Sequence, residues 1–176
     1  QFTASLSDLG ITVSTGRVVD FRAADFLQRE ATAESVPLLY PGHCRNGKIA
    51  WPRDGFKKCN WFRRCPGSES HLVPAGDYVL VRRFTAKEEK RRLVASLISV
   101  ADVPAPAYAF ENHLNYFHEA GQPLDPDLAK GLAVFLNSSL ADAYFRQFNG
   151  HTQVNATDLR NLRYPERESL IRMGCE

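Results

Sequence analysis

Residues 125–150 read DPDLAKGLAVFLNSSLADAYFRQFNG, and this stretch decides the fold expected for the chain. Large apolar side chains recur in it every three or four residues, which is typical of the buried face of an α-helix. They are Leu128, Leu132, Phe135, Leu136, Leu140, Tyr144, Phe145 and Phe148. Asp125 is a favoured N-cap residue, Pro126 suits the first helical turn, and Gly150 suits a left-handed C-cap. The pattern predicts one long amphipathic helix over about 126–148, which serves as a core element.

Length and composition are those of an ordinary globular domain. The chain has 176 residues and an apolar fraction of 44%, which suits one domain with a sizeable core. No stretch approaches the roughly 20 apolar residues of a membrane span, and no basic segment precedes an apolar leader. We therefore expect a cytoplasmic protein without membrane association. Because the chain starts at Gln1, we also expect a piece of a longer protein.

The four cysteines, Cys44, Cys59, Cys65 and Cys175, include no C-x-x-C pair. Structural zinc sites usually take closely spaced ligand pairs. The spacing therefore favours reduced thiols and no metal site.

Charge is distributed unevenly along a chain whose net charge is +2. Residues 53–92 hold eleven basic and five acidic side chains, so the remainder is acidic. A concentration of Lys and Arg is typical of a surface that neutralises phosphates, although solvated surface charge gives the same composition.

Strand patterns surround the basic segment. The stretch GITVSTGRVVDFR at 10–22 predicts strand, turn and strand, with Gly16 free to take a positive φ. Residues 37–76 are rich in Pro, Gly and isolated aromatic residues, which predicts short strands and long loops. AYAFENHLNYF at 107–117 predicts a single strand with polar groups on both faces.

Residues 77–100 have two interpretations. Thr85 and Glu88 form a capping-box pattern, and the apolar residues that follow have helical spacing, which favours a helix over about 86–98. Alternatively, 78–84 and 91–100 pair as a hairpin. Propensity alone leaves both open.

The C-terminal segment is mostly polar. Thr157 or Asp158 can cap a short final helical turn at 159–162, which Pro165 ends. Residues 166–176 are expected to be a polar tail. The fold class is therefore α+β, one domain of twisted, mostly antiparallel strands with one long helix.

Known catalytic motifs are absent from the sequence. It has no G-x-S-x-G, P-loop, dinucleotide-binding glycine pattern or H-E-x-x-H. Glu111 and His113 are a candidate pair of metal ligands, which leaves a metal-dependent nuclease as one alternative. Basic residues and amides are better represented, and these serve phosphates and base edges. The composition favours a recognition module over an enzyme.

Several segments, in this order, resemble one family. They are GITVSTGRVVDFR, YVLVRRFTAKEEKRRLVASL, FENHLNYF, GLAVFLNSSLADAYFRQFNG and HTQVNATDLRNLRYP. They look like the C-terminal target-recognition domain of TaqI-like adenine-specific DNA methyltransferases of restriction-modification systems. The last two segments are also similar to the helix and G-x-x-Q-x-N signature of type I restriction specificity subunits. The resemblance implies a hairpin over 78–99.

The same resemblance implies a function for residues 1–165, that of a DNA target-recognition domain. In that family a separate N-terminal domain binds S-adenosylmethionine and carries an N-P-P-Y motif that holds the adenine. Neither element occurs here. The implied chain is non-catalytic and binds no cofactor. Its implied partners are double-stranded DNA and a covalently attached methyltransferase domain. The resemblance leaves open a fused endonuclease in the parent protein.

Candidate DNA-binding residues follow from the basic segment, the polar strand and the post-helix signature, with loop residues of 43–65 expected to face the major groove. They are Arg17, Lys57, Lys58, Asn60, Arg63, Arg64, Arg82, Arg83, Lys87, Arg91, Arg92, Asn112, His113, Asn115, His151 and Gln153. No catalytic and no metal-binding residues are predicted. A protein-interaction module with a basic face is the other alternative.

Overall fold

Antiparallel strands and a group of α-helices make up the fold of residues 2–176, which the computed structural model describes. The helices are α1 (Pro126–Leu136), α2 (Ser139–Phe148), α3 (Ala156–Asn161) and α4 (Arg167–Cys175). One sheet contains, in spatial order, β1 (Thr12–Thr15), β11 (Leu114–His118), β8 (Tyr78–Arg82) and β9 (Ala95–Ile98). A second contains β2 (Leu27–Gln28), β6 (Trp61–Arg63), β3 (Ser35–Leu39), β10 (Ala107–Phe110) and β7 (Leu72–Pro74). Strands β4 (Cys44–Arg45) and β5 (Lys48–Ile49) form a small hairpin.

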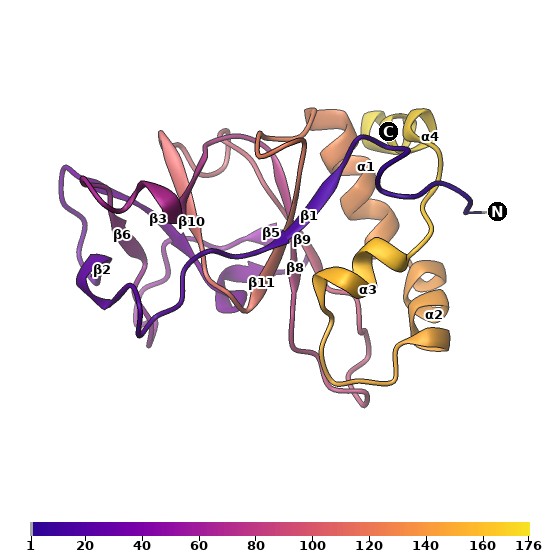
Figure 1. Cartoon of the computed structure of the whole chain (residues 1–176), viewed down its shortest axis with the longest axis horizontal. Helices are drawn as coiled ribbons and strands as arrows, with labels where there is room; N and C mark the ends of the chain where they lie inside the picture. Colours follow the sequence, from indigo (N-terminus) through magenta and orange to yellow (C-terminus); the bar gives the residue numbers. More distant parts are fainter. Residues whose placement is uncertain (1) are drawn as a thin grey trace.

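The helices lie at one end of the molecule and the five-stranded sheet lies at the other, with the four-stranded sheet between them (Figure 1). The largest apolar cluster joins the helices to the four-stranded sheet and includes Leu128, Leu132 and Phe145 together with Val79 and Val81. All strand pairs are antiparallel except that of β3 with β10. The predicted α+β class and single domain are confirmed. Within residues 2–176, none of the helices has the length and apolar character that a membrane crossing requires.

The helical segment 126–148 has the predicted ends and an internal break. The Asp125 carboxylate accepts hydrogen bonds from the amides of Asp127 and Leu128, as expected of an N-cap. Asn137 and Ser138 divide the segment into α1 and α2, because the Ser138 hydroxyl accepts from the Ala141 amide and caps a second helix. The Asn137 amide also bonds both backbone groups of Ala95 in β9. Gly150 does not serve as a left-handed cap, since α2 ends at Asn149 in an extended conformation.

The hairpin interpretation of residues 78–99 is confirmed, because β8 pairs antiparallel with β9. Thr85 therefore caps no helix. Its hydroxyl donates to the carbonyl of Arg92 at 2.9 Å and accepts from the Arg92 guanidinium at 3.2 Å. The capping-box pattern lies in the loop between β8 and β9, where the pairing of the two strands overrides local helical propensity.

The first predicted hairpin is wrong in its partner. Strand β1 pairs with β11, and residues 17–22 form a turn rather than a second strand. Gly16 is required for close packing instead of for a positive φ, since a Cβ there would lie 2.1 Å from the carbonyl oxygen of Glu111. The single strand expected at 107–117 is likewise two strands, β10 and β11, in different sheets.

Residues 166–176 are not the expected polar tail. They form α4, whose Leu170 is buried against the main core. A Cβ at Gly131 of α1 would lie 1.7 Å from the Leu170 carbonyl oxygen, and one at Gly174 would lie 1.9 Å from that of Asp127. Two glycines therefore allow α1 and α4 to approach at backbone distance, and local polarity gave no sign of this.

Candidate DNA interface

The turn Glu111-Asn112-His113 connects the two large sheets, with Glu111 buried, Asn112 half-buried and His113 exposed. Strand β10 ends just before it in the five-stranded sheet, and β11 begins just after it in the four-stranded sheet. Val18 holds the turn from the other side, because its amide donates to Phe110 O at 3.0 Å and its carbonyl accepts from the Asn112 amide at 2.8 Å. The backbone around Asn112 and His113 is therefore fixed on both flanks.

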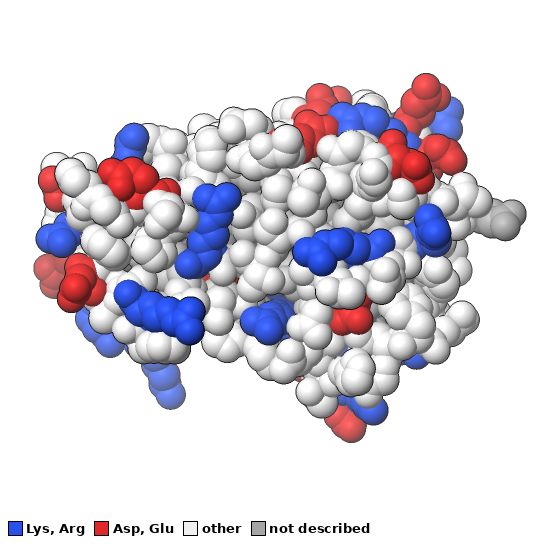
Figure 2. Space-filling view, in the orientation of Figure 1, with Lys and Arg blue, Asp and Glu red and all other residues white. Residues whose placement is uncertain are grey.

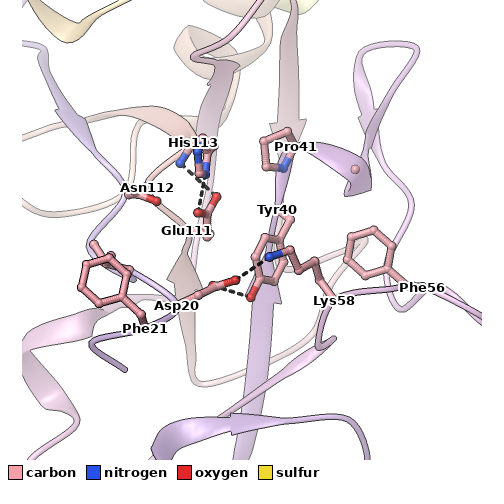
Figure 3. Close-up of a pocket in the computed structure, with 11 residues that line it drawn as sticks. Asp20, Phe21, Tyr40, Pro41, Phe56, Lys58, Glu111, Asn112 and His113 are labelled. Carbon is pink, nitrogen blue, oxygen red and sulfur yellow. Dashed lines mark hydrogen bonds and ion pairs between the residues drawn. The ribbon is translucent and has the colours of Figure 1, made fainter. Parts of the chain in front are cut away.

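A cavity of about 510 Å³ opens beside this turn, and we refer to it as the aromatic pocket (Figure 3). Its lining comes from the turn at 19–21, the start of the segment after β3, the 56–58 loop and the 111–113 turn. The lining residues are Val19, Asp20, Phe21, Tyr40, Pro41, Gly42, Phe56, Lys58, Glu111, Asn112 and His113. Figure 3 shows Phe21 and Phe56 on opposite sides, with Tyr40 between them.

Charged groups in the aromatic pocket are paired with one another. The Asp20 carboxylate accepts from the Tyr40 hydroxyl at 2.7 Å and from Lys58 Nζ at 2.8 Å. Burial, followed by this hydrogen bond, raises the pKa of Tyr40 far above its ordinary value. The hydrogen bond to Asp20 also raises the pKa of Lys58. At neutral pH the hydroxyl is therefore protonated and the ammonium charged.

Glu111 orients His113. The buried Glu111 carboxylate lies 2.5 Å from Nδ1 of His113 through one oxygen, and its other oxygen accepts from the His113 amide at 2.9 Å. Both carboxylate oxygens are thus occupied. Among residues 2–176 no group of three or more His, Cys, Asp or Glu side chains is placed to hold a metal ion. The arrangement fits a positioned imidazole better than the metal ligand pair of a nuclease.

Beneath the pocket, His43 and Asn60 form a buried support. Nδ1 of His43 accepts from the Tyr40 amide at 3.0 Å, and Nε2 lies 2.9 Å from the side-chain oxygen of Asn60. The Asn60 side chain also bonds both backbone groups of Arg53 and so stabilises this support. Its DNA contact stays a prediction. Burial lowers the pKa of His43, which keeps its ring neutral near pH 7.

A second cavity, of about 480 Å³, continues the polar surface from the 111–113 turn. It is lined by Lys87, Gly150, His151, Thr152, Gln153 and Asn155. Phe84 connects the two cavities, since its backbone pairs with that of Gln153 and its ring centre lies 5.1 Å from that of His113. Arg83 lies over the Phe84 ring and donates to the carbonyl of Asn112 at 3.3 Å. Predicted DNA-binding residues therefore come together around the two cavities. They are Lys58, Arg83, Lys87, Asn112, His113, His151 and Gln153.

Two other predicted residues are buried and hold the fold together. The Arg92 side chain, 1% exposed, donates to Thr85, to the Asn149 side chain at 3.1 Å and to the His151 carbonyl at 2.6 Å. Asn115 donates to the Val154 carbonyl at 2.7 Å and accepts from Thr15 at 3.2 Å. DNA cannot reach either group, because burial removes both from the surface.

Arg92 belongs to a network that we call the helix joint, made of Thr85, Arg92, Asp142 and Asn149. The Asp142 carboxylate accepts from the amides of Arg92 and Leu93 at 2.6 and 2.8 Å and from the Arg146 guanidinium at 2.8 Å. Burial raises the pKa of Asp142, but these hydrogen bonds outweigh it, and the pKa lies below its ordinary value. The helix joint therefore attaches Arg92 and Leu93, which precede β9, to α2.

The remaining predicted residues lie apart from the pocket or at its edge. Lys57 is exposed beside Lys58, Arg64 is exposed, and Arg63 is half-buried. Arg17 donates to the Leu72 carbonyl at 3.1 Å, and Arg82 lies 3.8 Å from Glu89. Arg91 donates to the Asn137 carbonyl, near the α1–α2 break. Their DNA contacts stay predictions.

Sequence patterns missed the hydrophobic part of this surface. Phe21 is 78% exposed, with the Arg22 guanidinium 5.3 Å from its ring centre, yet both were assigned to a strand. Asp20 and Tyr40 were also overlooked. The only signal in the sequence was Phe21-Arg22, an aromatic and a basic residue that follow Val18 and Val19. This pattern occurs both at the end of a strand and in an exposed turn.

Figure 2 shows the charge on one face of the molecule. Lys and Arg side chains lie across its middle, and many Asp and Glu side chains gather over the end where α1 and α4 lie (Figures 1 and 2). Further Asp and Glu side chains lie at the end where β2 and β6 lie, so on this face a polyanion is better accommodated across the middle than at either end (Figures 1 and 2).

Comparison with known proteins identifies two relatives. No family model matches the chain. The chain is 57% identical over 166 residues to the type II methyltransferase M.PstI of Providencia stuartii, and the match covers 94% of the chain and 33% of that protein. It is 46% identical over 170 residues to the type II methyltransferase M.BsuBI of Bacillus subtilis, covering 97% of the chain and 34% of that protein. The chain is thus similar, over nearly all its residues, to about a third of the length of two type II methyltransferases.

Proposed function

We propose that this chain is the sequence-specific DNA-recognition domain of a type II restriction-modification methyltransferase that modifies adenine at N6. The observation that carries the proposal is the identity of 46–57% to one third of two type II methyltransferases. A match of this extent supports a place for the chain within a larger type II methyltransferase, and the recognition role rests on the family resemblance described above. Adenine specificity rests on the resemblance to TaqI-like enzymes described above.

Under this proposal the chain supplies recognition and another domain supplies chemistry. The sequence holds no N-P-P-Y motif and no glycine-containing cofactor motif. A covalently attached domain would bind S-adenosylmethionine and hold the target adenine outside the helix. The cofactor would then have no site on the residues of this chain.

The surface chemistry supports DNA as the partner. Lys57 and Lys87 are exposed beside the two cavities and suit phosphate oxygens. Asn112 and Gln153 carry side-chain amides that suit adenine edges in the major groove. His113, held by Glu111 and half-exposed, adds an imidazole ring to this surface. Phosphate contacts would set the register of the protein on DNA, and the amides would contribute specificity.

Duplex DNA binding by the 176-residue chain tests the proposal. Selection from a library of random duplexes should recover a common sequence, and the logarithm of the affinity should fall linearly with that of the salt concentration. Lys57→Ala and Lys87→Ala should each reduce the magnitude of this slope by about 0.9. Lys130→Ala, in α1 at the helical end, is the matched control and should leave the slope unchanged. Affinity that is independent of salt, or an equal change for Lys130→Ala, would contradict the proposal.

A further inference from the structure

The aromatic pocket has a composition that none of the predicted phosphate or base-edge contacts explains. Three aromatic rings, those of Phe21, Tyr40 and Phe56, form its walls. Cavities of roughly 300–1,000 Å³ with apolar walls and a few polar groups are typical of sites for small planar ligands. At about 510 Å³ the aromatic pocket lies within this range.

Phe21 is presented to solvent on a turn that is fixed at both ends. The amides of Arg22 and Ala23 donate to the Val19 carbonyl at 2.9 and 3.0 Å, and Val18 and Ala23 are buried. The backbone is therefore ordered before any ligand binds. A phenyl ring that is 78% exposed on such a turn gains no stability from the fold, and its large apolar surface is available for stacking.

The charges of the pocket select against phosphate. Two carboxylates, Asp20 and Glu111, face one ammonium group, that of Lys58, and this ammonium already pairs with Asp20. A phosphate placed among them would meet repulsion from the carboxylates. A neutral planar base avoids this repulsion and can place its apolar faces against the aromatic walls.

Asn112 provides a free hydrogen-bonding group at the rim. Its backbone amide and carbonyl are occupied by Val18 and Arg83. Within residues 2–176 its side-chain amide makes none of the hydrogen bonds found, although it lines the pocket. An amide that the protein leaves unpaired at a fixed position is suited to pair with the edge of a base.

From these observations we propose that the aromatic pocket receives one nucleobase that leaves the stack of bound DNA. Phe21 stacks on the base, and Asn112 pairs with its edge. The inference rests on the proposed function and adds a base-binding site within the recognition domain itself. Aromatic side chains stack on unstacked bases of any sequence, whereas the Asn112 amide adds selectivity.

A mismatch scan of the selected duplex tests the inference with the 176-residue chain. Extruding a base breaks a pair, so a mismatch at that position removes part of the opposing free energy. At one position, mismatches should tighten binding by about tenfold, and at the other positions they should weaken it or leave it unchanged. Phe21→Ala and Asn112→Ala should both abolish the tightening at that position, and Phe21→Trp should retain it.

Phe148→Ala is the matched control, because this partly exposed phenylalanine lies in α2 rather than at the pocket. It should show the tightening of the unsubstituted chain. Tightening that persists in both Phe21→Ala and Asn112→Ala, or its absence at every position, would overturn the base site while salt-dependent duplex binding still supports the proposed function. A chain that binds no duplex would overturn both.

Discussion

The helix joint and the aromatic pocket contain the same kinds of residue and differ in what their polar groups contact. In the joint, Arg92 and Asp142 are buried and bonded to protein atoms. In the pocket, Asp20 and Glu111 are also paired, but Phe21 is exposed and the Asn112 amide is left open to the cavity. Internal pairing marks residues that serve stability. Exposed or unpaired groups on a fixed backbone mark residues that serve binding.

The largest effect that separates the two regions is expected from Arg92→Met. The side chain keeps its length, but the Asn149, Thr85 and His151 acceptors lose a buried donor, at about 1–3 kcal/mol for each unpaired group. Because some acceptors can turn toward water, we expect a loss of about 3 kcal/mol in the free energy of unfolding, measured in urea. Arg64→Met, on an exposed site, should change it little.

Duplex affinity of the folded Arg92→Met variant should equal that of the unsubstituted chain. A selective loss of affinity with full stability would show that Arg92 contacts DNA and would break the distinction between the two regions.

Gly131→Ala tests the packing of α1 against α4. The new methyl group would overlap the Leu170 carbonyl of α4, and overpacking of this kind costs about 1–3 kcal/mol. We expect the midpoint of urea unfolding to fall by the corresponding amount. Gly150→Ala has open space around it and should leave the midpoint nearly unchanged. Equal midpoints for the two variants would mean that α4 does not pack against α1 in solution.

Acidification should weaken the pocket's support before it weakens the helix joint. Burial lowers the pKa of His43 in the folded state, so the unfolded chain takes up protons first as pH falls below about 6.5. Stability from neutral His43 is therefore complete above that value and declines below it. His118, whose pKa is also lowered by burial and by Arg17, contributes in the same range.

Asp142 titrates in a lower range, because its folded pKa lies below the ordinary value of about 3.9. Its contribution is complete above that value and is lost as pH falls through the folded pKa. The free energy of unfolding, measured in urea at pH 7, 6 and 5, should decline with falling pH in the unsubstituted chain. The decline should be smaller in His43→Gln and as large as in the unsubstituted chain in Asp142→Asn. Equal declines in all three proteins would contradict this assignment.

The smallest effect is expected from Gln153→Ala, at the second cavity. Loss of one base-edge contact should weaken binding to the selected duplex by about 1 kcal/mol, or roughly fivefold, without a change in unfolding. Gln147→Ala, on the exposed surface of α2, is the matched control. Similar affinities for the two variants would remove Gln153 from the interface.

Local patterns in the sequence predicted the elements whose signals are local. The apolar periodicity and the Asp125 cap define the ends of the helical segment correctly. The break at Asn137 was missed because the apolar periodicity continues through the Ser138 cap and because Asn137 is held by β9, 42 residues away in sequence. The hairpin at 78–99 was decided by the family resemblance, since the capping-box pattern around Thr85 competed with it.

Burial decided the outcome for the candidate site. Adjacent Arg91 and Arg92 look alike in sequence, yet Arg92 points into the helix joint and Arg91 does not. Asn112 and Asn115 differ in the same way, because Asn112 lies in the turn between β10 and β11 whereas Asn115 is buried within β11. Such differences depend on how distant segments pack, which neither charge nor propensity reports. The α4 helix was missed for the same reason, as glycine contacts with α1 are invisible in a polar stretch.

Hydrogen–deuterium exchange of the 176-residue chain, with and without the selected duplex, tests most directly whether the surface of the two cavities binds DNA. We predict slower exchange at 19–22, 56–58, 83–90, 111–113 and 150–155 upon binding, and unchanged exchange in α1 and α4. Protection centred on α1 and α4, with these five segments unaffected, would contradict the proposed interface.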